Sequence, residues 1–187
     1  MKKTSICLFL IITSLSIFAQ KPKPVTPAPD MPMDTTTKLI TYTEVVQMPA
    51  ANAQELFKRA KKWVYGFYKS PSSVIQTLDS TNYIFVGKTN IIMVKTLKDG
   101  TKSNNSFINY TITINLKDGK YRYKITNFNM KDASYHAVEK FATEKDPETL
   151  DWDNQMLRQT DDYIKDLIGK LKTTMSKPSN EVKNDNW

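Results

Sequence analysis

Apolar and polar residues alternate from 110 to 128, and this pattern predicts two antiparallel strands joined by a tight turn. Asp118-Gly119 suits the centre of a type I′ hairpin turn, where both residues need positive φ. Folding the chain there puts apolar residues on one face and polar residues on the other. The apolar pairs are Leu116/Tyr121, Ile114/Tyr123 and Ile112/Ile125, and the polar pairs are Asn115/Arg122, Thr113/Lys124 and Thr111/Thr126. A slip of one residue would destroy this sorting, so the register is predicted together with the strands.

A second Asp-Gly pair, at 99–100, predicts a third strand by the same arithmetic. It places Phe85 opposite Ile114 and Tyr83 opposite Leu116 on the same apolar face. Residues 75–79 precede another turn and predict a fourth strand. Residues 39–48 are rich in β-branched side chains and predict a further strand at the start, ending at Pro49.

Two amphipathic helices are predicted, one on each side of this run of strands. Asn52 with Glu55 three residues later is typical of a helix start, and the helix should end at Ser70-Pro71-Ser72. Residues 151–175 carry an apolar stripe at helical spacing, with acidic residues at the start and lysines near the end, as the helix dipole favours. Residues 131–150 show no clear period and are expected to be a mixed loop with at most a helical turn.

The predicted fold class is therefore α+β, with element order β-α-β-β-β-β-α. An antiparallel sheet of four to five strands presents one apolar face, and the two helices pack on that face, as in a helix-grip arrangement. The sheet side chains on this face are large, so we expect them to fill the space beneath the helices.

The ends of the chain differ from the domain in composition. Residues 1–19 show the positive start, apolar middle and small terminal residue of a signal peptide, which predicts export to the periplasm or beyond. Residues 20–38 contain five prolines and are expected to be an extended tether. Residues 39–175 form the single domain, and 176–187 are expected to be a disordered tail. No other apolar run is long enough to span a membrane.

Two segments carry a family resemblance. YTITINLKDGKYRYKITNF (Tyr110 to Phe128) and LFKRAKKWVYGFYKSPSSVIQ (Leu56 to Gln76) resemble domain of unknown function family 4468, a family of exported bacterial proteins with a TBP-like fold. The resemblance implies a fold and no activity, and it brings no catalytic residues. DNA binding would rest on fold analogy alone, and export argues against it, so no nucleic-acid partner is expected.

Candidate chemistry is sparse, and we expect neither an enzyme nor a cofactor or metal site. Cleavage after Ala19 would remove Cys7, the only cysteine, and would leave a net charge of 25 − 19 = +6. His136 is the only histidine and stands in a polar stretch without a second ligand at metal spacing. The acidic residues at 146–153 lack the spacing of a calcium loop, and helix capping explains them. The glycines are dispersed, which excludes a phosphate-binding loop.

Two groups of residues remain as site candidates. The first is a basic surface that would face an acidic macromolecule or envelope component, formed by Lys58, Arg59, Lys61, Lys62, Arg122 and Lys124. The second comprises Thr35 and Ser80, which follow aspartates in expected surface segments and resemble a short bacterial O-glycosylation signal.

These observations leave the function unknown and favour an exported, non-enzymatic binding module. The alternative is a carrier or sensor that holds a small apolar ligand between sheet and helices. A hydrolase with paired carboxylates is a third hypothesis, which no motif supports.

Overall fold

The computed structural model describes residues 25–97, 99–131, 135–144 and 146–179. In chain order its elements are β1 (Tyr42–Gln47), α1 (Ala53–Phe67), α2 (Pro71–Val74), β2 (Ile75–Asp79), β3 (Ile84–Thr96), β4 (Lys102–Lys117), β5 (Lys120–Lys131), β6 (Tyr135–Ala137), α3 (Val138–Thr143) and α4 (Leu150–Met175). The strands form one antiparallel sheet in the order β1-β5-β4-β3-β2, with β6 added to β5. The predicted α+β class is confirmed, and β6 makes the sheet one strand larger than expected.

The predicted registers hold across the central strands. Leu116 lies opposite Tyr121 and Ile112 opposite Ile125, so the β4–β5 hairpin folds as the alternation requires. Phe85 lies opposite Ile114 in the β3–β4 pair. Tyr83 stands just before β3 with a φ of 54°, and its carbonyl accepts a hydrogen bond from the N–H of Leu116.

The β3–β4 register is reached by two compensating irregularities. Leu97 donates its N–H to the carbonyl of Thr101, so the hairpin closes across three residues rather than two. The register shifts by one residue at a bulge between Met93 and Lys95. From Met93 back to Ile84, each residue of β3 therefore lies opposite the β4 residue predicted from a two-residue turn at Asp99-Gly100. An extra residue in one strand changes the pairing by one position, which offsets the longer loop.

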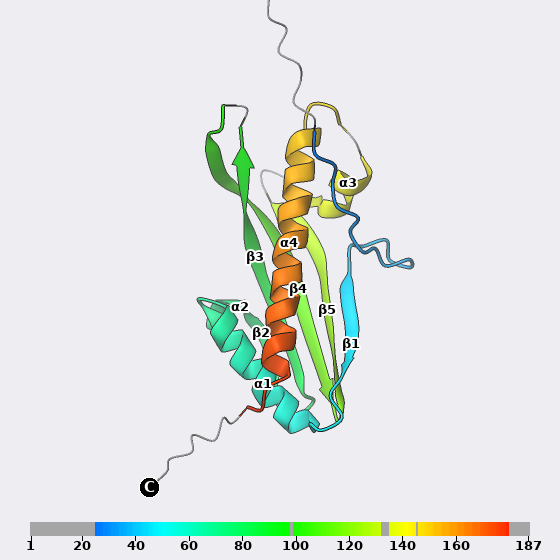
Figure 1. Cartoon of the computed structure of the whole chain (residues 1–187), viewed down its shortest axis with the longest axis vertical. Coiled ribbons are helices and arrows are strands. Elements are labelled where there is room, and N and C mark those ends of the chain that lie inside the picture. The colour runs from blue at the N-terminus through cyan, green and yellow to red at the C-terminus, as the bar shows by residue number, and fades with distance from the viewer. Residues whose placement is uncertain (1–24, 98, 132–134, 145, 180–187) are drawn as a thin grey trace, which may run out of the picture.

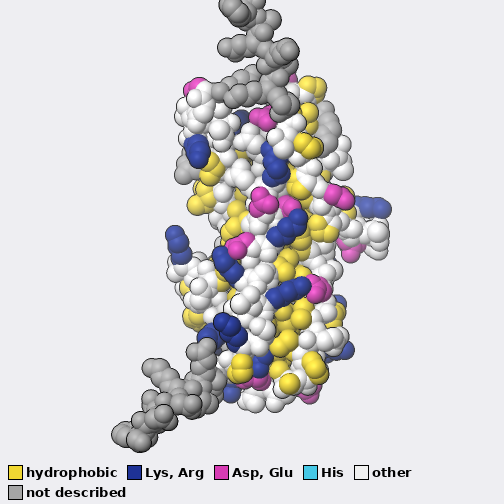
Figure 2. All heavy atoms as spheres, viewed as in Figure 1, with side chains coloured by type: hydrophobic (Ala, Val, Ile, Leu, Met, Phe, Trp, Pro, Cys, Tyr) yellow, Lys and Arg dark blue, Asp and Glu magenta, His cyan; other side chains and the backbone are white. Residues whose placement is uncertain are grey.

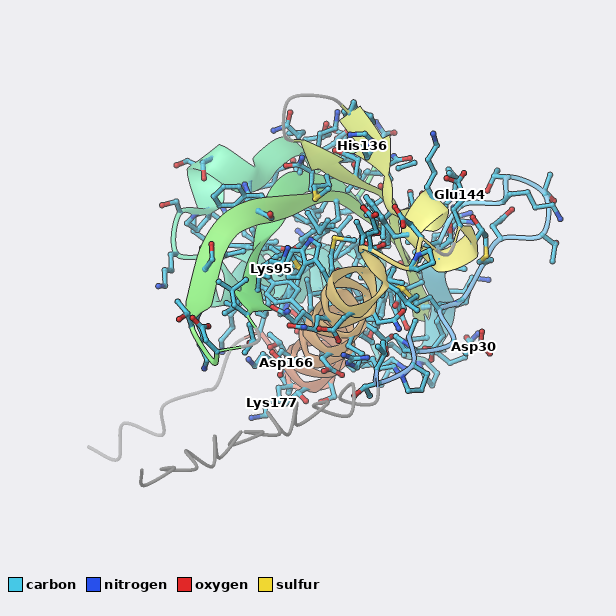
Figure 3. The ribbon with its side chains drawn as sticks, turned by 90° about the horizontal axis from the view of Figure 1, so that it is seen from above. Asp30, Lys95, His136, Glu144, Asp166 and Lys177 are labelled. Atoms are coloured by element: carbon cyan, nitrogen blue, oxygen red, sulfur yellow. The ribbon has the colours of Figure 1, made fainter. Side chains whose placement is uncertain are left out.

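The long sheet curls around α4, with α1 beside the lower half of that helix (Figure 1). Seen from above, the strands form an arc with α4 on its concave side (Figure 3). We call this helix-covered side the inner face of the sheet and the opposite side the outer face. Side chains from the strands and both helices meet on the inner face with at most 4% exposure: Leu56, Trp63, Phe85, Ile112, Ile114, Tyr121, Tyr123, Ile164, Leu167 and Leu171.

Aromatic rings fill the region where α1, α4 and the sheet meet. The ring centroid of Trp63 lies 5.4 Å from that of Phe67 and 6.4 Å from that of Phe85. The Tyr110 ring contacts Tyr163 of α4, and its hydroxyl lies 3.2 Å from the Tyr68 hydroxyl. Pairing these buried hydroxyls avoids the cost of an unsatisfied polar group. Large side chains thus occupy the layer between sheet and helices, as their size predicted.

Gly87 is the one inward position of β3 where a side chain would not fit. A Cβ there would lie 2.8 Å from the Phe85 ring and 3.2 Å from Cγ1 of Val74. Both distances are shorter than ordinary van der Waals contact. The absence of a side chain at Gly87 therefore lets α2 dock close to the sheet.

A second bulge, in β5, changes which residues face outward. Asn127 has a φ of 59°, and the register shifts between Asn109 and Thr111 of the partner strand. Asparagine tolerates this left-handed conformation better than most residues. Because of the extra residue, Phe128 stays buried on the inner face while Asn129 lies opposite Asn109.

The segment expected to be a tether packs on the domain from Thr26 onward. Arg158 of α4 donates hydrogen bonds to the carbonyls of Thr26 and Pro27, and Asn154 donates to the Thr26 carbonyl. Met31 is buried at 7% exposure. A proline-rich segment cannot form a regular strand or helix, so its backbone carbonyls remain available as hydrogen-bond acceptors. Donor side chains on a neighbouring helix can therefore bind it. The predicted signal peptide, residues 1–19, lies outside the described residues, as do residues 180–187 of the predicted tail.

The upper part of β3 extends beyond β2 and finds its hydrogen-bond partners on α4. The Gln159 side chain accepts from the N–H of Val94 and donates to its carbonyl, at 2.9 and 3.0 Å. Gln155 accepts from the N–H of Thr96 at 3.3 Å. These two amides stand in for a neighbouring strand along this edge.

Candidate binding surface on the outer face of the sheet

The outer face is formed by the polar partners of the alternating strands. Since both long helices lie on the inner face, the outward side chains run in uncovered rows across the sheet. From the hairpin end upward these rows are Val45/Arg122/Asn115/Ile84, then Thr43/Lys124/Thr113/Val86, then Thr126/Thr111/Lys88, and then Asn129/Asn109/Asn90.

Positive charge gathers on this face with little compensation. Asp79, at the end of β2, lies opposite Ile84 beside the first row, and Lys124 contributes, after the N–H groups of Thr37 and Thr36, to the lowered pKa of Asp34. Strands β3, β4 and β5 contain no aspartate or glutamate, and their outward positions hold Lys88, Lys117, Lys120, Arg122 and Lys124. Within the described part of the chain, none of these five cations lies within ion-pair distance of a carboxylate. Neighbouring charges of one sign add their potentials, so the face attracts anions.

A groove of about 600 Å³ lies on the same face, above the cationic rows. Its lining is almost entirely polar and comes from β3, β4, β5, β6 and the end of α2: Ser73, Lys88, Thr89, Asn90, Asn109, Tyr110, Thr111, Asn127, Asn129 and Tyr135. The β5 bulge creates this lining, because it brings Asn129 level with Asn109. A concave site with several convergent polar groups is the usual form of a ligand site.

A second hollow, of about 620 Å³, lies at the N-terminus of α1, but its hydrogen-bonding groups are already used. Asn52 accepts from the N–H of Glu55 at 2.9 Å, as the predicted cap requires, and Asp118 accepts from the N–H of Ala53 at 2.7 Å. With the first turn capped and a carboxylate in place, this helix end is a poor receptor for an anion.

The structure splits the predicted basic surface into two parts. Arg122 and Lys124 lie on the outer face of the sheet, whereas Lys58, Lys61 and Lys62 are exposed on α1, on the other side of the molecule. The sheet separates these two groups. Only the first group adjoins the groove.

Arg59 was expected on that surface, and this prediction is wrong. Arg59 is 8% exposed, because it follows Leu56 by three residues and shares the inward side of α1. Its guanidinium donates to Glu55 and to the carbonyl of Met175, both at 2.8 Å. A cation at this carbonyl caps the end of α4 and ties the two helices together. The spacing of Glu55 and Arg59 four residues apart was the available signal.

The two candidate glycosylation residues lie in similar turns. Asp34 accepts hydrogen bonds from the N–H groups of Thr36 and Thr37, and Asp79 accepts from those of Thr81 and Asn82. The N–H of Thr37 is the main cause that lowers the pKa of Asp34, and that of Asn82 acts likewise on Asp79.

Each aspartate of these two motifs thus has a structural role in its turn. Thr35 and Ser80 are both exposed. Their modification stays a prediction, which the intact mass of protein from the native host would test.

His136 lies in β6, opposite Met130 and partly buried, with its ring centroid 6.4 Å from that of Phe141. It therefore belongs to a strand rather than to the predicted polar loop. In the described ranges no three His, Cys, Asp or Glu side chains come together as metal ligands would. No helix in those ranges has the length and apolar character needed to cross a bilayer.

Comparisons with known proteins bear on the fold. The crystal structure of a DUF4468 family protein from Bacteroides ovatus superposes with a TM-score of 0.63 at 15% identity, covering 80% of this chain and 92% of that one. The crystal structure of a TBP-like protein from Parabacteroides distasonis superposes with a TM-score of 0.54 at 13% identity, covering 76% and 97%. A comparison with curated proteins gives no match. Residues 42–131 match the model of the domain of unknown function (DUF4468) with TBP-like fold, so the predicted resemblance is confirmed over this stretch of the chain.

Proposed function

We propose that this protein is an exported binding domain that recognises an acidic macromolecule with the outer face of its sheet. The observation that carries the proposal is the set of five outward cations on three strands that hold no carboxylate. Such a surface speeds encounter with a negatively charged partner and disfavours positively charged ones.

The hairpin end of the outer face concentrates this charge. Lys117 and Lys120 lie directly opposite each other, and Arg122 and Lys124 follow on the same face of β5. Like charges at such separations repel, which disfavours the free protein. An anionic partner would relieve that repulsion, so the arrangement favours the complex over the free domain.

The alternative of a carrier has less support. A small apolar ligand between sheet and helices would need the space that Trp63, Phe85 and Tyr110 occupy. Binding on the outer face requires no such rearrangement.

Charge reversal on the two sides of the molecule tests the proposal. We expect the double variant Arg122→Glu/Lys124→Glu to elute from immobilised heparin at clearly lower salt than the wild type. Lys58→Glu/Lys62→Glu is the matched control, because it changes the net charge equally on the helix side, and it should elute close to the wild type. If the helix variant lost more affinity than the sheet variant, the outer face would not be the binding surface.

Export is tested separately. The intact mass of protein recovered from the native host's periplasm or medium should lack residues 1–19, as the signal-peptide pattern predicts. Full-length chain retained in the cytoplasm would contradict this part of the proposal.

A further inference from the structure

The groove on the outer face differs in chemistry from the cationic rows beside it. Four asparagines contribute to its lining from the outer face, together with Thr111, and Lys88 is its only charged residue. A carboxamide offers both donors and an acceptor, whereas lysine offers donors alone. The groove therefore suits a ligand whose groups both donate and accept hydrogen bonds.

Part of this lining is held in a fixed orientation. Asn109 donates to the side-chain oxygen of Asn129 at 3.0 Å, and Asn129 donates to the carbonyl of Asn127 at 2.8 Å. These bonds fix the way the two amides point, so the acceptor oxygen of Asn109 is left for another molecule. A site whose polar groups are ordered before binding loses less entropy when a ligand arrives.

Two further asparagines remain available at the rim. Asn90 and Asn127 are both exposed, and within the described ranges their side chains make no hydrogen bond. The left-handed backbone of Asn127 sets its side chain apart from the regular alternation of β5.

An aromatic ring completes the groove. Tyr135 of β6 is 70% exposed, more than any other large hydrophobic side chain that the structure describes. A ligand in the groove would therefore meet the apolar face of a ring and the polar groups of the amides at the same time. A pyranose sugar suits such a site, because its C–H face can stack on the ring and its hydroxyls can donate to and accept from the amides.

An extended acidic peptide fits less well. Peptides add to sheets through backbone hydrogen bonds at an edge. The groove lies on the face of the sheet, and the central strand beneath it, β4, is already paired with β3 on one side and with β5 on the other.

We propose that this groove is a sugar-binding site, in which a pyranose ring stacks on Tyr135, its hydroxyls bond to Asn90, Asn109 and Asn127, and an acidic substituent faces Lys88. This inference deepens the proposed function, on which it rests, by assigning the acidic macromolecule to the class of glycans with acidic sugars. The groove would bind one sugar unit, and the cationic rows would bind acidic groups along the rest of the polymer.

Titration of the isotope-labelled chain with four monosaccharides tests the site by NMR. The probes are glucuronate and galacturonate, each with its neutral counterpart, glucose or galactose. We expect saturable shifts of the side-chain amide signals of Asn90 and Asn127, with dissociation constants in about the millimolar range. The uronates should bind more tightly than the neutral sugars, and Lys88→Gln should remove that preference.

Matched variants separate recognition from folding. Tyr135→Ala should weaken sugar binding about tenfold, whereas Tyr65→Ala, at an exposed tyrosine of α1, should leave it unchanged. Asn90→Ala should weaken it without altering the rest of the spectrum. The inference is wrong if none of the four sugars shifts the groove signals, or if tetraglutamate shifts them and the sugars do not.

The two proposals fail differently. If sugars bind in the groove but Arg122→Glu/Lys124→Glu leaves heparin elution unchanged, the groove is a sugar site and the acidic-partner proposal fails. If that variant loses heparin affinity but no sugar enters the groove, the charged face stands and the sugar site fails.

Discussion

The inner and outer faces of the sheet are made by alternate residues of the same strands, yet they obey different constraints. Ile112 and Ile114 are fully buried on the inner face, while Thr113 and Asn115 between them are only half-buried on the outer face. The inner residues are determined by the need to exclude water and fill space. The outer residues meet no such demand, so their charge and amide content points to interactions with other molecules.

The same contrast separates the charges of the helix side from those of the sheet. Basic and acidic side chains are interspersed on the helix side (Figure 2). On α4 they include the pairs Lys165–Asp161 and Lys170–Asp166, at 2.7 and 2.6 Å. A third contact, Lys172–Glu44 at 2.6 Å, joins α4 to β1. The acidic side chains of α4 thus compensate much of the positive charge around them, whereas the five cations of the outer face, like Lys58, Lys61 and Lys62 of α1, make no ion pair among the described residues.

The largest effect should come from truncating neighbouring residues on the two faces. Ile114→Ala removes a fully buried side chain and should lower the unfolding free energy by about 2–5 kcal/mol. Asn115→Ala, one residue away on the outer face, should stay within about 0.5 kcal/mol of the wild type. Urea denaturation measures both. Comparable losses at the two positions would show that the outer face also contributes to folding stability.

Alanine substitution of one glycine in the sheet and one in α4 should change the stability of the domain in opposite directions. Gly87→Ala forces a Cβ against Phe85 and Val74 and should destabilise the domain by about 1–3 kcal/mol. Gly169→Ala lies in α4 with no atom within 4 Å of the new Cβ, so it should stabilise by about 0.5–1 kcal/mol. Melting temperatures of the two variants should therefore move in opposite directions. A neutral Gly87→Ala would mean that α2 shifts without cost.

The smallest effect concerns pH, and on the helix side it should arise at Glu55. Hydrogen bonds from Ser179 first, and then from Arg59, lower the pKa of Glu55 from its usual 4.5 to about 2. A depressed pKa stabilises the folded state above the unfolded value, and this contribution is lost as pH falls from about 4.5 towards 2.

The side chain of Glu55 is 27% exposed, so its contribution should stay below about 1 kcal/mol. The stability advantage of the wild type over Glu55→Gln should therefore shrink with acid, as denaturation at a series of pH values would show. A pH-independent difference would contradict this assignment. Arg122→Gln should show no such trend, because this side chain does not titrate in the range and no carboxylate of the described residues lies within ion-pair distance of it.

The sheet and both long helices could be predicted because their local patterns agree with the fold. Asp118-Gly119 and strict alternation determine the β4–β5 register, and the helix predicted at 151–175 is α4 within one residue. The segment packed on α4 from Thr26 could not be predicted, since it has neither period nor apolar stripe. Its hydrogen bonds to α4 are made by carbonyl groups, which every sequence provides.

The candidate site was missed for a different reason. Uninterrupted pairing from the β4–β5 hairpin would place Phe128 opposite Asn109, and the asparagine row would not exist. The bulge at Asn127 changes that register, and no local signal announces it, because asparagine is common in many other contexts. Residues 90, 109 and 129 become neighbours only once the pairing of three strands is known.

The glutamines of α4 have a consequence for how the protein behaves among its own copies. An uncovered strand edge is a template on which another chain can add a strand and begin aggregation. Gln159 and Gln155 occupy backbone groups of Val94 and Thr96, where β3 extends past β2. A second molecule would have to displace these side chains before it could pair there. Helix α4, which completes the core, therefore also protects this end of β3 from self-association. The outer face of the sheet stays uncovered, but the β3 edge beside it is not.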